Sequence, residues 1–386
     1  MRWIIRVGVL LLVLLGAGYV FGSAILEASL NKVTPHAAYA PGAEAKALHA
    51  TLDLADLHAD TLLWGRDVLE RGTRGHVDVP RLAEGRFALQ VFSTVTKTPR
   101  GQNYNRNTAD SDSITLLALI NAWPPHTWRS LTERALFQAE RLHDAARRAP
   151  DRLMIVRSKA DVATLMARRA KGETVVGGLI ATEGAHALDG SIDNVKRLHE
   201  AGFRMIGLTH FFDNDVGGSL HGATKGGLTP LGYQVVRAME AQGIIVDIAH
   251  ASEQVVADVL KVTTRPPVVS HTGVRGTCDS PRNLSDDTMK AIAARGGLIG
   301  IGYWKGAVCD DTPAGVAKAI RYAVDLVGED HVALGSDYDG STTVVFDAAE
   351  SAALVEAMLK SGLTPQQVRK VAGANVMAFL AANLPA

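Results

Sequence analysis

Short apolar runs alternate with amphipathic stretches along most of the chain, and this pattern predicts strands separated by helices. Residues 52–57 alternate between apolar and acidic or small side chains, a period of two that is typical of a half-buried strand. Seven further strands are predicted at residues 87–93, 174–183, 203–210, 243–250, 267–271, 298–304 and 331–337. Helix start signals, such as serine followed three residues later by an acid, predict helices beginning near residues 130, 158, 191, 252, 285, 312, 347 and 364.

Eight strands separated by helices favour an α/β fold of the closed parallel (β/α)8 type, the TIM-like barrel. The rival is an open doubly wound sheet, which usually has a glycine-rich phosphate-binding turn after its first strand. In this chain His58-Ala59-Asp60 follows the first strand instead. We therefore expect one barrel domain over residues 46–386.

The N-terminal stretch has a different character. Arg2 and Arg6 precede an uncharged run from Val7 to Leu26, which is long enough to span a bilayer as a helix. We expect residues 1–26 to be an uncleaved signal anchor, one transmembrane helix, and the Ala- and Pro-rich residues 27–45 to be a linker. A cleaved signal is the alternative, with Ala38-Tyr39-Ala40 as the nearest small-residue site. The two arginines imply that the N-terminus stays inside and the barrel faces outside.

The charge balance and the cysteine count add two constraints. The 40 basic residues match the 40 acidic ones, which argues against a nucleic-acid partner because such proteins carry a basic excess. Cys278 and Cys309 are the two cysteines. On the count alone, a disulfide in an oxidising compartment and two unrelated buried thiols are equally open.

Metal-type side chains stand at the ends of six predicted strands: His58, Asp60, Glu183, His210, His250, His271 and Asp337. Each alone is explained as well by hydrogen bonding in a core or loop. In a parallel barrel, however, the carboxyl ends of all strands meet at one rim. Burying so many ionisable groups there without a cation would be costly, so the set predicts a metal site. It exceeds the needs of one tetrahedral zinc and suits two metal ions bridged by a carboxylate.

At this point the chain resembles a bacterial member of the membrane (renal-type) dipeptidases, zinc metallopeptidases with a barrel related to the amidohydrolases. The resemblance covers about residues 50–380. It is carried by His58-Ala-Asp60, Thr182-Glu-Gly-Ala-His186, Leu208-Thr-His210, Val246-Asp-Ile-Ala-His250, Ser270-His271, Arg282-Asn283 and Gly335-Ser-Asp-Tyr-Asp-Gly340. The segment 211–228 departs from the mammalian members, so the substrate preference is not carried over.

The resemblance implies a cofactor of two zinc ions per chain. It assigns His58 and Asp60 to one ion and His250 and His271 to the other, with Glu183 bridging them.

The resemblance also assigns roles in the hydrolysis of dipeptides by a metal-bridging hydroxide. His210 would contact the substrate at the scissile carbonyl, Arg282 would bind the substrate carboxylate, and Asp337 would act as the proton shuttle and line the substrate site. Cys278 and Cys309 coincide with a disulfide of mammalian relatives, which favours the bridged pair.

These assignments lead to an expected setting and to rival functions. We expect a protein of the bacterial inner membrane whose catalytic domain faces the periplasm, with a secreted or periplasmic form after signal cleavage as the alternative; homodimers are common in that family.

Another binuclear amidohydrolase, such as a lactonase, deaminase or phosphotriesterase, is disfavoured because Glu183 stands where many of those enzymes use a modified lysine. A non-catalytic barrel is the third reading. Five other histidines are expected to be ordinary loop or helix residues: His76, His186, His199, His221 and His331.

Overall fold

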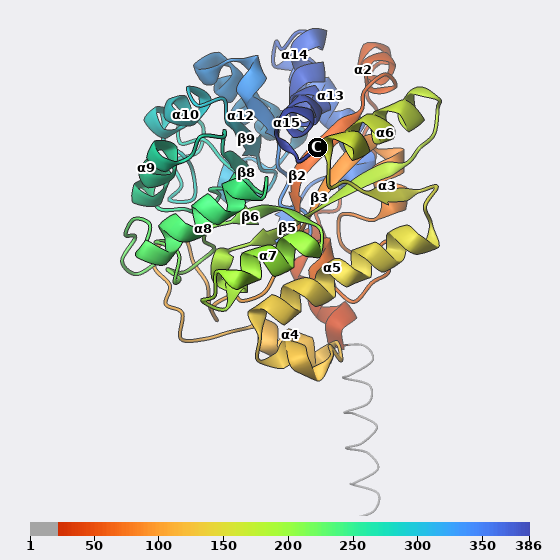
Figure 1. Cartoon of the computed structure of the whole chain (residues 1–386). Coiled ribbons are helices and arrows are strands. Elements are labelled where there is room, and N and C mark those ends of the chain that lie inside the picture. Colours follow the sequence, from red (N-terminus) through yellow and green to blue (C-terminus); the bar gives the residue numbers. More distant parts are fainter. Residues whose placement is uncertain (1–21) are drawn as a thin grey trace, which may run out of the picture.

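The computed structural model describes residues 22–386, and its centre is a closed barrel of eight parallel strands (Figure 1). The barrel strands are β2 (Leu54–Ala59), β3 (Phe87–Val95), β5 (Val176–Glu183), β6 (Phe203–Gly207), β7 (Ile245–Asp247), β8 (Val268–Thr272), β9 (Leu298–Ile301) and β10 (Val332–Leu334). The strand order is β3-β2-β10-β9-β8-β7-β6-β5, and pairing of β3 with β5 closes the ring. The short β4 (Leu153–Ile155) adds to β5. The predicted (β/α)8 barrel is confirmed.

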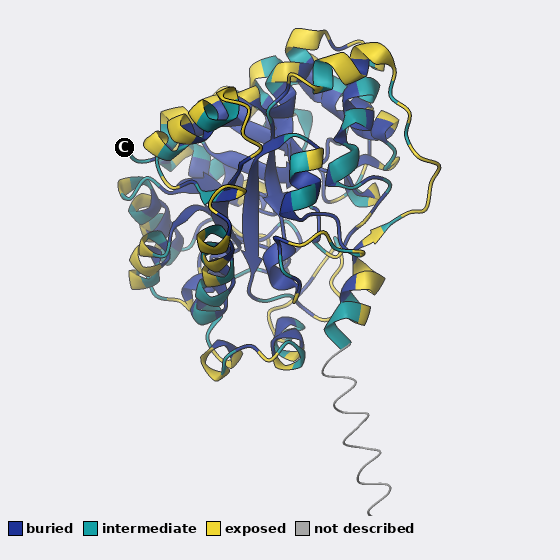
Figure 2. Cartoon of the chain, turned by 90° about the vertical axis from the view of Figure 1, so that its right-hand side faces the viewer, coloured by how far each residue is buried: buried dark blue, intermediate teal, exposed yellow. Residues whose placement is uncertain are grey.

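Helices surround the barrel and leave their outer sides to solvent (Figure 2). Their bounds are α2 (Ala43–His49), α3 (Val79–Glu84), α4 (Ile114–Ile120), α5 (Leu131–Arg148), α6 (Lys159–Ala170), α7 (Asp193–Glu200), α8 (Pro230–Ala241), α9 (Glu253–Val262), α10 (Asp286–Ala293), α11 (Lys305–Val308), α12 (Pro313–Val327), α13 (Ser351–Lys360), α14 (Pro365–Arg369) and α15 (Asn375–Asn383). The predicted starts agree with the caps: the side chain of Ser130 accepts a hydrogen bond from the backbone N–H of Glu133, and Thr312 caps α12 ahead of Pro313.

The strands are buried on both faces, as parallel strands covered by helices must be. Every residue of β2, β3 and β5 is buried, and Figure 2 shows the strands dark blue at the centre of the molecule. Because βα connections follow each strand, the carboxyl ends of all eight strands open onto the same rim. This rim carries the candidate site.

Most of the expected membrane anchor lies outside the described residues. Within residues 22–386, no helix combines the length and apolarity needed to cross a bilayer. Residues 22–30 are helical, and β1 (Lys32–Val33) pairs in parallel with β11 (Thr343–Val344). The stretch 27–45, expected to be a linker, therefore contacts the barrel domain at defined points.

Candidate metal centre

Glu183 ends β5 and stands at the centre of a buried cluster of histidines. Its Oε1 atom lies 3.1 Å from Nε2 of His250, 3.3 Å from Nε2 of His271 and 3.7 Å from Nε2 of His58. Its Oε2 atom lies 3.2 Å from Nε2 of His210. One carboxylate thus faces four imidazole rings that come from four different strands or the loops after them.

Two further acids extend the cluster on the His58 side. Oδ1 of Asp60 lies 3.3 Å from Nε2 of His58, and Oδ1 of Asp337 lies 4.0 Å from the same nitrogen. Three overlapping groups result, each of which has its ligand atoms within 4.8 Å of one another: His58, Glu183 and His271; Glu183, His210 and His250; and His58, Asp60 and Asp337. All seven metal-type residues singled out from the sequence therefore meet at the rim of the barrel.

Backbone conformation, as well as strand direction, aims these side chains. The prediction put His210, His250 and Asp337 on the last residue of their strands, whereas β6, β7 and β10 stop three residues earlier. His250 and Asp337 have φ values of 59° and 60°, in the left-handed region that costs a non-glycine residue about 1–3 kcal/mol. The chain leaves the sheet before these residues and turns their side chains into the barrel mouth.

The donor atoms fit a divalent metal. Nε2 of His58 and Oδ1 of Asp60 are buried and have no hydrogen-bond partner among the described residues. Nε2 of His250 faces Nε2 of His271 at 2.9 Å, and both nitrogens converge on the same oxygen of Glu183. Buried polar atoms are normally satisfied, and imidazole nitrogens with carboxylate oxygens are the donor set that zinc prefers. Bound cations would satisfy these atoms together.

The electrostatics of the cluster lead to the same conclusion. Burial raises the pKa of the carboxyl groups of Asp60 and Glu183 well above the ordinary value, and raises that of Asp337 to about 8. Burial also lowers the pKa of three surrounding histidines well below the ordinary value: His210, His250 and His271. The rings are therefore neutral, as metal ligands must be, and a divalent cation would supply the positive charge that the acids lack.

Ser270 orients two of the histidine rings from behind. Its hydroxyl lies 2.9 Å from Nδ1 of His271 and 3.3 Å from Nδ1 of His58. The backbone N–H of Ser270 donates to Oδ1 of Asp247 at 3.0 Å, which fixes the serine in turn. Hydrogen bonds of this kind hold a ring so that its Nε2 points at the ligand position.

A cavity of about 510 Å³ opens directly onto the cluster. One wall comes from the polar loop 96–112, which contributes Gln102, Asn103 and Tyr104, and another comes from residues 340–343. The hydroxyl of Tyr104 accepts a hydrogen bond from Nε1 of Trp304 at 2.7 Å, which ties the loop across the mouth. The cavity has the size of a small-molecule site.

Arg282 lines this cavity with its guanidinium group. It is buried, and its Nη2 donates to the backbone oxygen of His271 at 2.8 Å and lies 3.4 Å from Nε2 of His250. The group also lies 5.5 Å from the ring centroid of Trp304. Among the described residues no carboxylate lies within 4.0 Å of it. A buried arginine without an acid partner offers donors to an anionic ligand.

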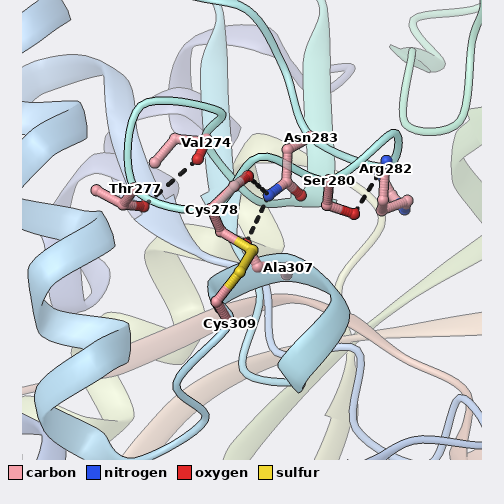
Figure 3. The surroundings of a disulfide bond; sticks show 8 residues. All are labelled: Val274, Thr277, Cys278, Ser280, Arg282, Asn283, Ala307 and Cys309. Carbon is pink, nitrogen blue, oxygen red and sulfur yellow. Dashed lines mark hydrogen bonds between the residues drawn. A yellow bond between two sulfur atoms is a disulfide. The ribbon is translucent and has the colours of Figure 1, made fainter.

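A disulfide braces the loop that carries Arg282 (Figure 3). Cys278 and Cys309 are bonded, with their Cα atoms 5.4 Å apart. Beside the bridge, Nδ2 of Asn283 donates to the backbone oxygens of Cys278 and Ala307, each at 2.8 Å. The covalent bond and the two hydrogen bonds fix the backbone on both sides of the arginine.

Sequence reasoning missed one neighbour of the cluster. His221 is buried, its ring centroid lies 5.3 Å from that of His250, and its Nδ1 lies 2.9 Å from the backbone oxygen of Tyr104. It stands in the segment 211–228, far from any strand end, so its spacing gave no signal. The hydrogen bond to the 96–112 loop could be found only from the structure.

Comparison with known proteins places the chain in a family. The profile of the membrane dipeptidases (peptidase family M19) matches residues 42–383. Dipeptidase aclJ of Aspergillus oryzae is 28% identical over 348 residues, covering 85% of this chain and 77% of that protein. In fold, the chain is similar to a metallopeptidase of Rhodobacter sphaeroides bound to a phosphinate mimic of the dipeptide L-Ala-D-Ala (TM-score 0.69, 24% identity, 86% and 99% of the two chains). It is also similar to the probable dipeptidase PvdM of Pseudomonas aeruginosa (TM-score 0.73, 19% identity, 88% and 97%). The profile covers nearly the whole barrel domain together with the clustered histidines and acids, and the chain therefore belongs to the membrane dipeptidase family of metallopeptidases.

Proposed function

We propose that the chain is a zinc-dependent dipeptidase that holds two zinc ions in the buried cluster. His58 and Asp60 would hold one ion and His250 and His271 the other, with Glu183 between them. The observation that carries this proposal is the central position of the Glu183 carboxylate, whose Oε1 atom lies 3.1 Å from Nε2 of His250 and 3.7 Å from Nε2 of His58. A carboxylate within reach of two separate sets of ligands is what a bridged pair of metals requires.

Asp337 is the candidate proton shuttle. Two zinc ions, when bound, would supply an activated water and an electrophile for the scissile carbonyl. Asp337 lines the cavity and is positioned to take a proton from the attacking water and pass it to the leaving amine.

Arg282 and His210 would hold the two ends of the reacting group. The guanidinium of Arg282, which has no acid partner in the described chain, would pair with the free carboxylate of a dipeptide. His210 lines the same cavity, and its Nδ1 has no hydrogen-bond partner among residues 22–386. A neutral His210 would hydrogen-bond the carbonyl oxygen as negative charge develops on it.

The cavity has room for a dipeptide. The 96–112 loop and residues 340–343 wall it in, and the volume of about 510 Å³ leaves room for a small substrate. The related Rhodobacter sphaeroides metallopeptidase was solved with a dipeptide mimic.

The proposal extends to location. We infer that residues 1–26 anchor the enzyme in the bacterial inner membrane with the barrel in the periplasm. The uncharged run from Val7 to Leu26 supports the anchor, and the disulfide between Cys278 and Cys309 supports an oxidising compartment. Membrane fractionation followed by N-terminal sequencing distinguishes the anchored form from a cleaved periplasmic one.

The ligand assignment is tested with His250→Ala in the full-length enzyme. We expect turnover of a panel of L,L- and L,D-dipeptides to fall at least about a thousandfold, because a residue that would hold one of the two zinc ions has been removed. Zinc content should fall from about two to about one per chain, with an unchanged far-UV circular dichroism spectrum. His199→Ala, on the outer helix α7, is the matched control and should leave both quantities unaltered. Unchanged turnover or zinc content in His250→Ala would refute the assignment.

A second variant separates ligands from substrate contacts. His210 lies as close to Glu183 as the expected ligands do, so distance alone does not rank it. The proposal expects His210→Ala to keep about two zinc ions while losing turnover. Loss of a zinc ion from this variant would make His210 a ligand instead.

A further inference from the structure

The stretch ahead of the family match packs behind the wall of the candidate active site. We call residues 22–34 the N-terminal arm; it consists of the helical residues 22–30 and the strand β1. The family profile begins at residue 42, so the arm lies outside the part of the chain that the family shares. In Figure 1 the arm lies at the end of the barrel domain where the described chain begins.

A buried ion-pair network joins the arm to the barrel. The side chain of Glu27 is fully buried and pairs with Arg66 and with Arg74, whose Nε lies 2.6 Å from Oε2 of Glu27. Arg66 in turn pairs with Asp339 through its Nη2. Because a charge buried in this way is strongly destabilising when one partner is removed, Glu27, Arg66 and Asp339 hold one another in place.

Asp339 belongs to a strained loop, residues 337–343, which we call the shuttle loop. Three of its non-glycine residues have left-handed φ values: 60° at Asp337, 62° at Asp339 and 59° at Ser341. Such conformations persist only where the surroundings hold them. Asp339 is held by the hydroxyl of Thr61 at 2.7 Å and the backbone N–H of His76 at 2.6 Å, in addition to Arg66.

The arm also holds the far end of the shuttle loop directly. Oδ1 of Asn31, which is buried, accepts a hydrogen bond from the backbone N–H of Ser341 at 2.8 Å. The backbone N–H of Lys32 donates to the oxygen of Thr342 at 3.2 Å, and β1 pairs with β11 immediately after it. Residues 340–343 line the cavity, so a single backbone segment separates the arm from the substrate site.

We propose that the N-terminal arm is a positioning element of the active site: Glu27, acting through Arg66 and Asp339, and Asn31, acting on Ser341, set the shuttle loop so that Asp337 faces the cluster. The role of Asp337 rests on the function proposed above. A segment ahead of the family match thereby supports, from behind, the loop that lines the site.

The test compares Glu27→Gln with Glu44→Gln in the full-length, zinc-loaded enzyme. Glu44 is an exposed acid in α2, so its substitution changes the same charge without touching the network. For Glu27→Gln we expect kcat on a dipeptide to fall about tenfold, because Asp337 is displaced. KM and zinc content should stay within about twofold, and Glu44→Gln should match the wild type.

Asn31→Ala keeps the inference testable where loss of the Glu27 charge prevents folding. It removes a single hydrogen bond to the shuttle loop while the β1–β11 pairing remains, so we expect a smaller fall in kcat, about two- to threefold. All assays are run well below the melting temperature of each variant. Wild-type kcat in both variants, with only a lowered melting temperature, would overturn the inference, because the arm would then contribute to stability and not to the position of Asp337.

Asp337→Asn, assayed beside them, separates the two proposals. If Asp337→Asn keeps wild-type kcat, the proposed shuttle is wrong, whatever the arm variants do. If Asp337→Asn loses kcat and the arm variants do not, the shuttle holds and the arm inference fails.

Discussion

Asp337 and Asp339 are two residues apart and both have left-handed backbone conformations, yet their surroundings are opposite: Asp339 is buried, whereas Asp337 is partly exposed at the cavity. Asp339 is surrounded by partners: burial raises the pKa of its carboxyl, but Arg66, His76 and the hydrogen bonds from His76 and Thr61 together outweigh burial and lower the pKa. Asp337 faces the cavity, where burial outweighs the nearby histidine and raises the pKa of its carboxyl to about 8. Asp339 is thus a fixed structural anion, whereas Asp337, in the same loop, is an acid that is costly to ionise.

Two buried arginines repeat the contrast. Arg66 pairs with both Glu27 and Asp339, whereas Arg282 has no acid within 4.0 Å among the residues described. A buried charge that is paired holds its neighbours in place. A buried charge without a partner destabilises the fold unless a ligand supplies the opposite charge. The groups left short of partners therefore mark where metal and substrate are expected to bind.

The largest effect on activity should come from removing the Asp337 carboxylate. We expect Asp337→Asn to lower kcat by about a hundredfold to ten-thousandfold, the usual contribution of a positioned acid or base. The free energy of unfolding of the metal-free variant should equal or exceed that of the wild type, since a carboxyl group that is costly to ionise has been replaced by a neutral amide. Steady-state kinetics and urea unfolding check the two halves, and a marked loss of stability would remove the contrast with Asp339.

Removing the Asp339 carboxylate should lower stability. We expect Asp339→Asn to destabilise the protein by about 3 kcal/mol, because Arg66 is left buried with only one of its two acids. Urea unfolding at pH 7 measures this, with Asp337→Asn as the matched control in the same loop. Stability equal to the wild type would show that Glu27 alone neutralises Arg66.

Much of the barrel was predictable because strand and helix patterns are local. All eight barrel strands overlap the predicted runs, although β2, β3 and β8 end one or two residues beyond them, and the serine and threonine caps begin their helices where expected. The helix α8 was not predicted, although Thr229-Pro230 ahead of buried Val235 and Val236 carried the signal. The residues of the cluster were predictable for a related reason, since parallel strands end at one rim.

The Glu27 network could not be predicted, because its partners are set by the tertiary fold. Glu27 and Asp339 are more than 300 positions apart, and nothing local to either residue distinguishes it from a solvated acid. The residues 27–45 look like a linker by composition, whereas β1 finds its partner only after β11 has been placed. The left-handed backbone of His250 and Asp337 was equally invisible, since neither is glycine.

Substituting Arg282 should weaken substrate binding, an effect smaller than the losses of activity and stability predicted for Asp337 and Asp339. We expect Arg282→Lys to raise KM for dipeptides about tenfold, because lysine keeps the charge but loses the planar pair of donors that fits a carboxylate. Arg66→Lys should instead lower stability and leave KM nearly unchanged. Kinetics with a dipeptide and with its C-terminal amide check the assignment: the amide should be insensitive to Arg282→Lys, and equal KM increases for both substrates would contradict it.

The last prediction concerns the acid sensitivity of the region around Asp339, which depends on the buried ring of His76 and develops gradually with pH. The ring is buried, its Nδ1 accepts a hydrogen bond from the backbone N–H of Asp339, and burial lowers its pKa to about 4. In the unfolded chain the ring titrates near pH 6.5, so between about pH 6.5 and 4 the unfolded state binds a proton that the folded state does not.

Stability should therefore be complete above about pH 6.5 and fall as the pH drops toward 4, by about 3 kcal/mol at most from this residue. Asp339, whose pKa is lowered, would add its own loss only below about pH 4. Urea unfolding of metal-free protein between pH 7 and 5 measures the slope, which should flatten in His76→Asn relative to the wild type. His186, whose pKa burial lowers to about 3, keeps its own contribution in both proteins, so part of the slope should persist, and an unchanged slope in His76→Asn would contradict the role given to His76.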